Sequence, residues 1–304
     1  MHDHSHAHSH THGPKDFGRT FAITTALNVA LVIGQAVFGF YANSLALLAD
    51  AGHNLSDVMG LLLAWGAVAI AGWRPSARYT YRLHSASILA ALANALLLLA
   101  AVGAISWEAI QRFNAPEEVA SGTVVALAAL GVAVNGFSAW LLSRGSRSDL
   151  NVHGAFLHMM ADAGVSVAVI VAALGIRFTG WQWLDPAVSL LISVVILVGT
   201  WNLLRESLKL SLNAAPVGTD LEAIERYLRA QPEIADMHDL HVWALSTTET
   251  ALTCHIVMPG GHPGDGFLRR LTDELHHKFN IGHCTIQIEL GDAGRCALAP
   301  DTVL

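Results

Sequence analysis

Six long apolar stretches follow one another through the first two thirds of the chain, and short polar segments separate them. A helix needs about 20 residues to cross the hydrocarbon core of a bilayer, and each stretch reaches that length. The first stretch lacks the small-residue cleavage pattern of a signal peptide, so we expect all six to be membrane helices. The predicted spans are residues 17–40, 45–71, 86–110, 119–142, 153–176 and 184–206.

Beyond residue 213 the pattern changes to that of a small soluble domain, with polar helices and alternating strands. Two alternating segments around a Thr-Thr-Glu turn predict a hairpin. The order helix, hairpin, helix, strand predicts an α+β domain of ferredoxin-like type. The predicted elements are a helix at 220–230, strands at 238–246 and 250–258, a helix at 265–279 and a strand at 284–290.

Composition agrees with a membrane protein, because 53% of the residues are hydrophobic and only 13% are charged, where a soluble domain carries roughly 25% charged residues. The predicted fold class is an α-helical membrane protein, with six transmembrane helices followed by a small cytoplasmic α+β ferredoxin-like domain. The predicted regions are a His-rich tail at 1–16, a transmembrane domain at 17–212, the ferredoxin-like domain at 213–292 and a C-terminal tail at 293–304.

Basic residues gather in alternate loops, which predicts the orientation in the membrane, because short cytoplasmic loops accumulate Lys and Arg. We therefore expect both termini in the cytoplasm. The residues on that side are Lys15, Arg19, Arg74, Arg78, Arg82, Arg144, Arg147, Arg205 and Lys209. In a reducing compartment, an odd number of cysteines predicts free thiols or occasional metal ligands at Cys254, Cys284 and Cys296.

Two predicted membrane helices each place a histidine and an aspartate four residues apart: His53 with Asp57, and His158 with Asp162. Residues i and i+4 share one helix face, and an unpaired ionisable group at mid-bilayer costs about 2.5–3.5 kcal/mol on insertion scales. We therefore expect the two pairs to face each other. Two imidazoles and two carboxylates form a tetrahedral N2O2 shell that suits a divalent ion such as zinc.

Other polar residues in the spans have neither this spacing nor a matched partner. We interpret Asn28, Gln35, Asn94 and Asn135 as interhelical hydrogen-bonding groups. For Asp50, one turn before His53, we favour a helix cap or a position on the access path over direct metal ligation.

The N-terminal sequence MHDHSHAHSHTHG alternates histidine with other residues, which is typical of a weak metal-collecting tail. An engineered tag is the alternative, but a tag is usually an uninterrupted run. The collecting residues would be His2, His4, His6, His8, His10 and His12.

Four motifs together resemble the cation diffusion facilitators, a family of metal/proton antiporters: SLALLADAGHNLSDV, DPAVSLLISVVIL, HDLHVWALSTTETALTCHIV and CTIQIE. The resemblance implies a homodimer of six-span protomers, with a transport site between spans two and five at His53, Asp57, His158 and Asp162. Paired His and Asp resemble the zinc-preferring branch, the bacterial zinc/cobalt/cadmium efflux type associated with metal resistance. Its members lie in the bacterial inner (plasma) membrane as multi-pass proteins.

The resemblance also implies a cytoplasmic metal site at His238, His255 and Glu289, which the hairpin and the last strand would bring together. Gln287 departs from family forms in which a histidine contributes. The loop before span three departs as well, because it lacks the family's acidic residue near His84. We therefore favour the absence of a salt bridge between that loop and the soluble domain and of a metal site there, with a weak one that involves His84 as the alternative.

Ligand chemistry predicts the mechanism, because imidazole must be neutral and carboxylate ionised before a metal binds, so protons and metal compete. We predict export of Zn²⁺ from the cytoplasm in exchange for protons by alternating access, with Cd²⁺, Co²⁺ or Ni²⁺ as other possible substrates. We expect no enzymatic activity and no nucleic-acid partner. A metal-gated channel or sensor is the alternative. An intramembrane metalloprotease ranks behind it, because the chain has no His-Glu-x-x-His motif and four protein ligands would close the shell.

Overall fold

The computed structural model describes the chain except for residues 1–15, 72–76, 82, 144–149, 292–295 and 297–304. The predicted histidine-rich tail lies outside the described residues. The chain forms two compact units, one of residues 1–61 and 97–199 and the other of residues 62–96 and 200–304. The long helices are α1 (Asp16–Tyr41), α2 (Leu45–Ala71), α3 (Ala86–Asn114), α4 (Ser121–Ser143), α5 (Leu150–Thr179) and α6 (Leu184–Ser211).

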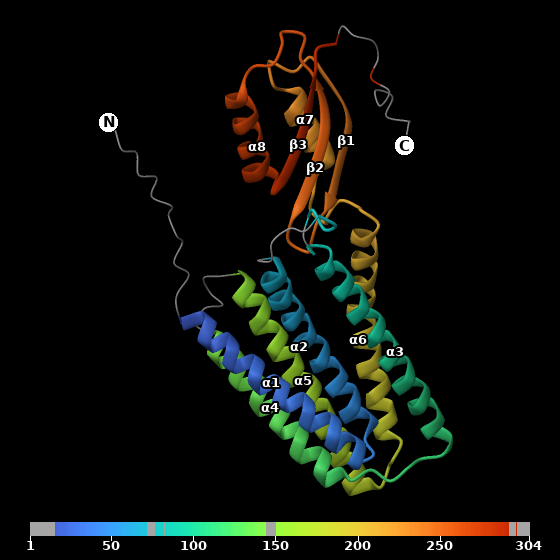
Figure 1. Cartoon of the computed structure of the whole chain (residues 1–304). Coiled ribbons are helices and arrows are strands. Elements are labelled where there is room, and N and C mark those ends of the chain that lie inside the picture. The colour runs from blue at the N-terminus through green and yellow to red at the C-terminus, as the bar shows by residue number, and fades with distance from the viewer. Residues whose placement is uncertain (1–15, 72–76, 82, 144–149, 292–295, 297–304) are drawn as a thin grey trace. The chain divides into compact units, whose positions relative to one another are not determined.

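The helices of the first unit form where the sequence predicts spans (Figure 1). They pack against one another through small and β-branched residues. Ala46 and Ala49 of α2, Ala128 of α4 and Ala173 of α5 belong to one buried cluster with Val169. Small side chains let helix backbones approach closely within a membrane. Among the described residues, four helices are long and apolar enough to cross a bilayer: α3, α4, α6 and the Phe156–Thr179 part of α5. The helical membrane fold is thus confirmed.

Asp185, in the first turn of α6, caps the start of α2. Its carboxylate accepts hydrogen bonds from Ser44 Oγ at 2.5 Å and from the Leu45 backbone N–H at 2.7 Å. An acceptor at this position satisfies donors that the first helical turn leaves free and interacts favourably with the helix dipole. The start of α2, eight residues before His53, is therefore fixed to α6.

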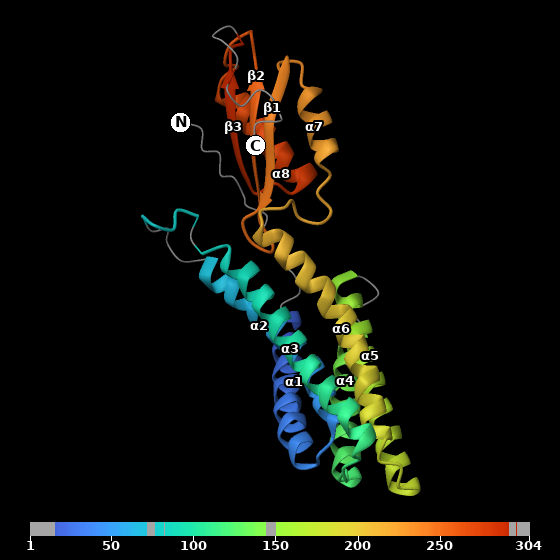
Figure 2. The same ribbon diagram turned by 90° about the vertical axis from the view of Figure 1, so that its right-hand side faces the viewer.

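The soluble domain consists of α7 (Leu221–Arg229), β1 (Asp236–Ala244), β2 (Thr250–Val257), α8 (Asp265–Phe279) and β3 (His283–Glu289). Strand β2 is central, antiparallel to β1 and parallel to β3. Both helices lie on one face of the sheet (Figure 2). The core on that face contains Ile224 and Leu228 of α7, Leu271 and Leu275 of α8, and Leu252 of β2. The other face of the sheet is left for polar side chains, and the predicted order of elements is confirmed.

The pairing of β1 with β2 is interrupted between His238 and His241. Asp239 there has a φ of 54°, in the left-handed region that Asp and Asn tolerate better than most residues. A bulge of this kind redirects the side chains that follow it. Simple alternation, which we used for this strand, therefore does not hold across its whole length.

The segment before α3 binds the turn of the hairpin. His84 Nδ1 lies 2.6 Å from Glu249 Oε2, and the Thr247 backbone N–H donates to Ser87 Oγ at 3.2 Å. The alternative that we left open, an interaction through His84, is the one that the structure contains, because Glu249 supplies the carboxylate from the hairpin turn. A sequence comparison confined to the loop does not reveal that partner.

We expect Leu252→Ala to destabilise the soluble domain by about 2–5 kcal/mol, because a fully buried leucine leaves a cavity when truncated. Hydrogen–deuterium exchange of the full-length protein should show faster exchange across 221–289. The control is Leu290→Ala, since Leu290 is 51% exposed and its truncation should change stability by no more than about 0.5 kcal/mol. Equal effects of the two substitutions would contradict this assignment of the core.

Candidate metal centres

The first centre joins α2 to α5. His53 Nε2 lies 3.0 Å from Asp162 Oδ1, and the Asp162 side chain is only 1% exposed. His158, one turn before Asp162 on α5, has its Nε2 3.7 Å from Asp162 Oδ2. The rings of His53 and His158 lie 6.0 Å apart between centroids. The structure thus brings together three of the four residues that the sequence selects.

Asp57 is the fourth predicted ligand. Its backbone lies in α2, but its side chain is outside the described part of the structure. Because Asp57 is four residues after His53, both lie on the same helix face. Its place in the centre therefore stays a prediction.

The atoms of this centre suit a divalent ion. Ligand atoms bound about 2.0–2.2 Å from zinc in a tetrahedron lie roughly 3.3–3.6 Å from one another. The distance from His53 Nε2 to Asp162 Oδ1, 3.0 Å, lies just below that range, and His158 Nε2 lies 3.7 Å from the other oxygen of the same carboxylate. An ion needs only small side-chain movements to displace the contact between His53 and Asp162.

A hydrogen-bonded network surrounds Asp50 next to this centre. Its carboxylate accepts from Gln35 Nε2 of α1 at 2.5 Å, from Ser166 Oγ of α5 at 3.1 Å and from Asn54 Nδ2 at 3.4 Å. Asp50 is fully buried in the second turn of α2, so it is not a helix cap. The cap is Asp185. Asp50 instead ties three helices together one turn from His53. The other role that we favoured, a position on the access path, stays a prediction.

Gly131 of α4 packs against this network. A Cβ at Gly131 would lie 2.8 Å from Ser166 Oγ and 3.3 Å from Gln35 Nε2, so only glycine allows α4 to approach so closely. Gln35 bonds between helices as predicted, because it donates to Asp50 of α2. Asn135 does not, since neither of its side-chain polar atoms has a hydrogen-bond partner among the described residues.

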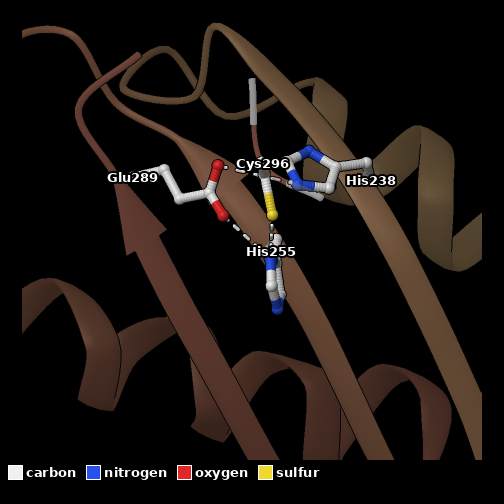
Figure 3. A group of neighbouring side chains, drawn as sticks. All are labelled: His238, His255, Glu289 and Cys296. Atoms are coloured by element: carbon white, nitrogen blue, oxygen red, sulfur yellow. Dashed lines mark hydrogen bonds and ion pairs between the residues drawn. The ribbon is translucent and has the colours of Figure 1, made fainter. Parts of the chain in front are cut away.

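The second centre lies on the polar face of the sheet (Figure 3). It contains His238 of β1, His255 of β2, Glu289 of β3 and Cys296, whose ligand atoms all lie within 4.8 Å of one another. His255 Nδ1 is 2.8 Å from Glu289 Oε1 and 3.6 Å from Cys296 Sγ. His238 Nε2 is 3.6 Å from Glu289 Oε2. Two imidazoles, a carboxylate and a thiol form a donor set that fits zinc.

Strand register explains why these residues meet. His238 is paired with His255 across β1 and β2, and Val257 is paired with Glu289 across β2 and β3. Gln287, beside His255, donates to Glu289 Oε1 at 3.2 Å. Gln287 therefore supports the carboxylate.

Sequence reasoning did not place Asp239 or Cys296 in this centre. Asp239 Oδ1 lies 2.8 Å from His241 Nε2, and its Oδ2 lies 3.7 Å from His255 Nε2. At 3.7 Å this oxygen is beyond hydrogen-bond distance of His255, but it places a negative charge close to the imidazole. Asp239 reaches this position through the bulge, which alternation does not reveal. Cys296 lies beyond the last strand, where no periodic pattern exists to place it.

Hydrogen bonds hold the Glu289 carboxylate ready to bind a cation. Burial alone would raise its pKa, but hydrogen bonds from Cys296, His255 and Gln287 and the nearby His238 outweigh burial and keep the pKa below its usual value. Burial raises the pKa of Cys254 to about 12 and that of Cys284 to about 11. These two cysteines therefore stay protonated thiols, which leaves Cys296 as the cysteine suited to bind metal.

Comparison with known proteins identifies the family of this chain. Residues 21–210 match the cation efflux transmembrane domain, and residues 216–290 match the cytoplasmic domain of cation efflux proteins. The chain belongs to the cation efflux, or cation diffusion facilitator, family. The metal cation efflux system protein CzcD of Cupriavidus metallidurans is 40% identical over 290 residues, which cover 95% of this chain and 90% of CzcD.

Two further relatives of this cation efflux protein cover most of its length. The zinc transporter ZitB of Escherichia coli is 38% identical over 293 residues, 95% of this chain and 92% of ZitB. The cadmium, cobalt and zinc/H⁺–K⁺ antiporter of Bacillus subtilis is 34% identical over 276 residues, 89% of this chain and 88% of that protein. The cation efflux protein is therefore a membrane transporter of metal cations and not an enzyme.

Zn²⁺ should protect Cys296 from alkylation, because a metal-bound thiolate is not available to react. We expect iodoacetamide to modify Cys296 at least about tenfold more slowly in zinc-loaded protein, measured by mass spectrometry. Cys284 is the control within the same domain and should react at the same rate with and without zinc. Equal alkylation of Cys296 in both samples would exclude it as a ligand.

Proposed function

We propose that this cation efflux protein exports Zn²⁺ from the cytoplasm in exchange for protons, through a transport site formed by His53, Asp57, His158 and Asp162. The observation that carries the proposal is the contact between His53 Nε2 and Asp162 Oδ1, 3.0 Å long, inside the membrane domain. It places a nitrogen donor of α2 beside an oxygen donor of α5. The names of the relatives support the two ions: ZitB is a zinc transporter, and the Bacillus subtilis relative is an antiporter that uses H⁺.

Competition between protons and metal for the same lone pairs supplies the coupling. Without metal, the contact between His53 and Asp162 holds a proton between the two side chains. A metal ion that binds both atoms displaces that proton, and a proton that returns displaces the metal. An ordinary histidine titrates near pH 6.5, so a more acidic exterior favours release there. Movement of helices around the site would then alternate its access between the two sides.

The types of ligand at the proposed transport site also determine which metal ions it can bind. Imidazole and carboxylate together suit zinc and also accept cadmium, cobalt and nickel, which differ in affinity more than in ligand type. The relative from Bacillus subtilis is named for cadmium, cobalt and zinc. We therefore propose Zn²⁺ as the principal substrate, with Cd²⁺ and Co²⁺ as further substrates and Ni²⁺ on ligand chemistry alone.

We further propose a homodimer in the bacterial inner membrane, with both termini in the cytoplasm. The soluble domain matches a cytoplasmic family named for its dimer, and an even number of spans would put the N-terminus on the same side. The second centre would then bind cytoplasmic Zn²⁺, supplied in part by the histidines at 2–12. Bound there, zinc would fix β1 to β3 and to Cys296.

Asp162→Asn is expected to lower zinc flux by at least about 100-fold, because loss of a ligand costs more than the 10- to 100-fold loss that follows removal of a supporting residue. The measurement is zinc uptake, with an internal pH dye, into proteoliposomes at several imposed pH gradients. Wild-type protein should move zinc and protons in opposite directions. Asp57→Asn should resemble Asp162→Asn.

Asp273→Asn is the matched control, since Asp273 is an exposed aspartate on α8 and its substitution should leave flux unchanged. Zinc flux that is independent of the pH gradient and does not saturate would indicate a channel. Flux that survives both membrane substitutions would overturn the proposed site.

A further inference from the structure

Asn135 is an unusual residue in the membrane domain. Its side chain is fully buried in α4, yet among the described residues neither Oδ1 nor Nδ2 has a hydrogen-bond partner. A buried polar group without a partner costs roughly 1–3 kcal/mol, and an amide has one acceptor and two donors to satisfy. The residue therefore has unused hydrogen-bonding capacity inside the bundle.

The packing of α4 on α5 shows what lies opposite. The buried residues of α4 include Val124, Ala128, Gly131 and Asn135, so they form one stripe along the helix. Gly131 lies against Ser166 of α5. These consecutive helices have a short connection and run antiparallel. One turn forward from Gly131 is Asn135, and one turn back from Ser166 is Asp162, so Asn135 lies at the level of Asp162.

Asp162 of α5 has an acceptor atom without a donor, just as Asn135 has a donor atom without an acceptor. Its Oδ1 contacts His53, but its Oδ2 is buried without a hydrogen bond among the described residues, with His158 Nε2 at 3.7 Å. A donor with no acceptor on α4 and an acceptor with no donor on α5 thus lie at the same level of two packed helices.

A bound metal would make use of both groups. A carboxylate that gives one oxygen to a metal usually has its other oxygen hydrogen-bonded, and loss of such a supporting group costs 10- to 100-fold in affinity. One-oxygen binding suits four-coordinate zinc. A larger ion such as Cd²⁺ accepts both oxygens of a carboxylate more readily, so it depends less on a donor to the second oxygen.

We propose that Asn135 is a positioning residue that determines specificity, because its amide donates to Asp162 Oδ2 when a metal occupies Oδ1. Binding of the ion separates Asp162 from His53, and rotation of the carboxylate brings Oδ2 to Asn135. The carboxylate is then held in the one-oxygen geometry that favours Zn²⁺ over Cd²⁺. This inference rests on the proposed function, since it places the transported ion at Asp162.

The test compares zinc and cadmium transport by Asn135→Leu and the wild type in proteoliposomes. Leucine has the same number of side-chain heavy atoms with the same branching, and it has no polar atom. We expect KM for Zn²⁺ to rise about tenfold, KM for Cd²⁺ to change less than about threefold, and kcat to change little. Thermal stability should stay the same or rise, because the unsatisfied amide is gone. Asn135→Gln, which keeps an amide, should recover part of the zinc preference.

Ser189→Ala is the matched control. Ser189 is another fully buried side chain whose polar atom has no partner among the described residues, and it lies one turn from Asp185, at the start of α6. Its substitution should leave the ratio of the two KM values unchanged. If Asn135→Leu fails to fold, Asn135→Ala decides, because alanine is smaller than asparagine and has no donor, so it should show the same loss of zinc preference.

Two results would overturn this inference while leaving the proposed function intact. In the first, wild-type protein exchanges zinc for protons and Asn135→Leu keeps the zinc-to-cadmium KM ratio within about twofold. In the second, stability falls and both KM values rise equally, which indicates a packing role. Absence of saturable zinc flux in the wild type would instead contradict the proposed function itself.

Discussion

Burial of charge inside an apolar helix bundle is the constraint on which the membrane domain depends. Asp162 is almost completely shielded from solvent, and lipid offers it no compensation, so the protein itself must supply a partner. His53 does so across the gap between α2 and α5. The same need is met differently at Asp50, where neutral donors from α1, α2 and α5 surround the carboxylate. Both oxygens of Asp50 thus accept hydrogen bonds, whereas Asp162 Oδ2 accepts none among the described residues.

In the proposed mechanism, this contrast separates a structural role for Asp50 from a transport role for Asp162. The donors around Asp50 leave it no oxygen without a hydrogen bond, which fixes the helices around it. The contact at Asp162 is with an imidazole, a group that exchanges protons for metal in the physiological range of pH. A hydrogen bond from Ser166 of α5 to Asp50 of α2 links these two helices one turn away. In the proposed mechanism, metal and protons therefore exchange at Asp162 by side-chain movement, and access to the site changes by movement of helices around it.

Periodicity predicted the helices, the order of elements in the soluble domain and the paired His-Asp residues, because those features depend on local pattern and on the cost of burying charge. The metal centre on the sheet was predicted only for residues on regular strands. Asp239 depends on a bulge with a left-handed φ, and Cys296 follows the last strand without any pattern. The salt bridge between His84 and Glu249 joins residues 165 positions apart, and no local rule connects them. The register of α4 on α5, with Gly131 against Ser166, likewise appears only when the helices are packed.

Anomalous X-ray diffraction at the zinc edge, on crystals of the full-length protein saturated with Zn²⁺, tests the central claim most directly. The account predicts a zinc peak between α2 and α5, coordinated by nitrogen and oxygen atoms of His53, Asp57, His158 and Asp162. It predicts a separate peak on the sheet that includes the sulfur of Cys296. Zinc bound in the soluble domain alone, with no peak beside Asp162 at saturation, would contradict the account.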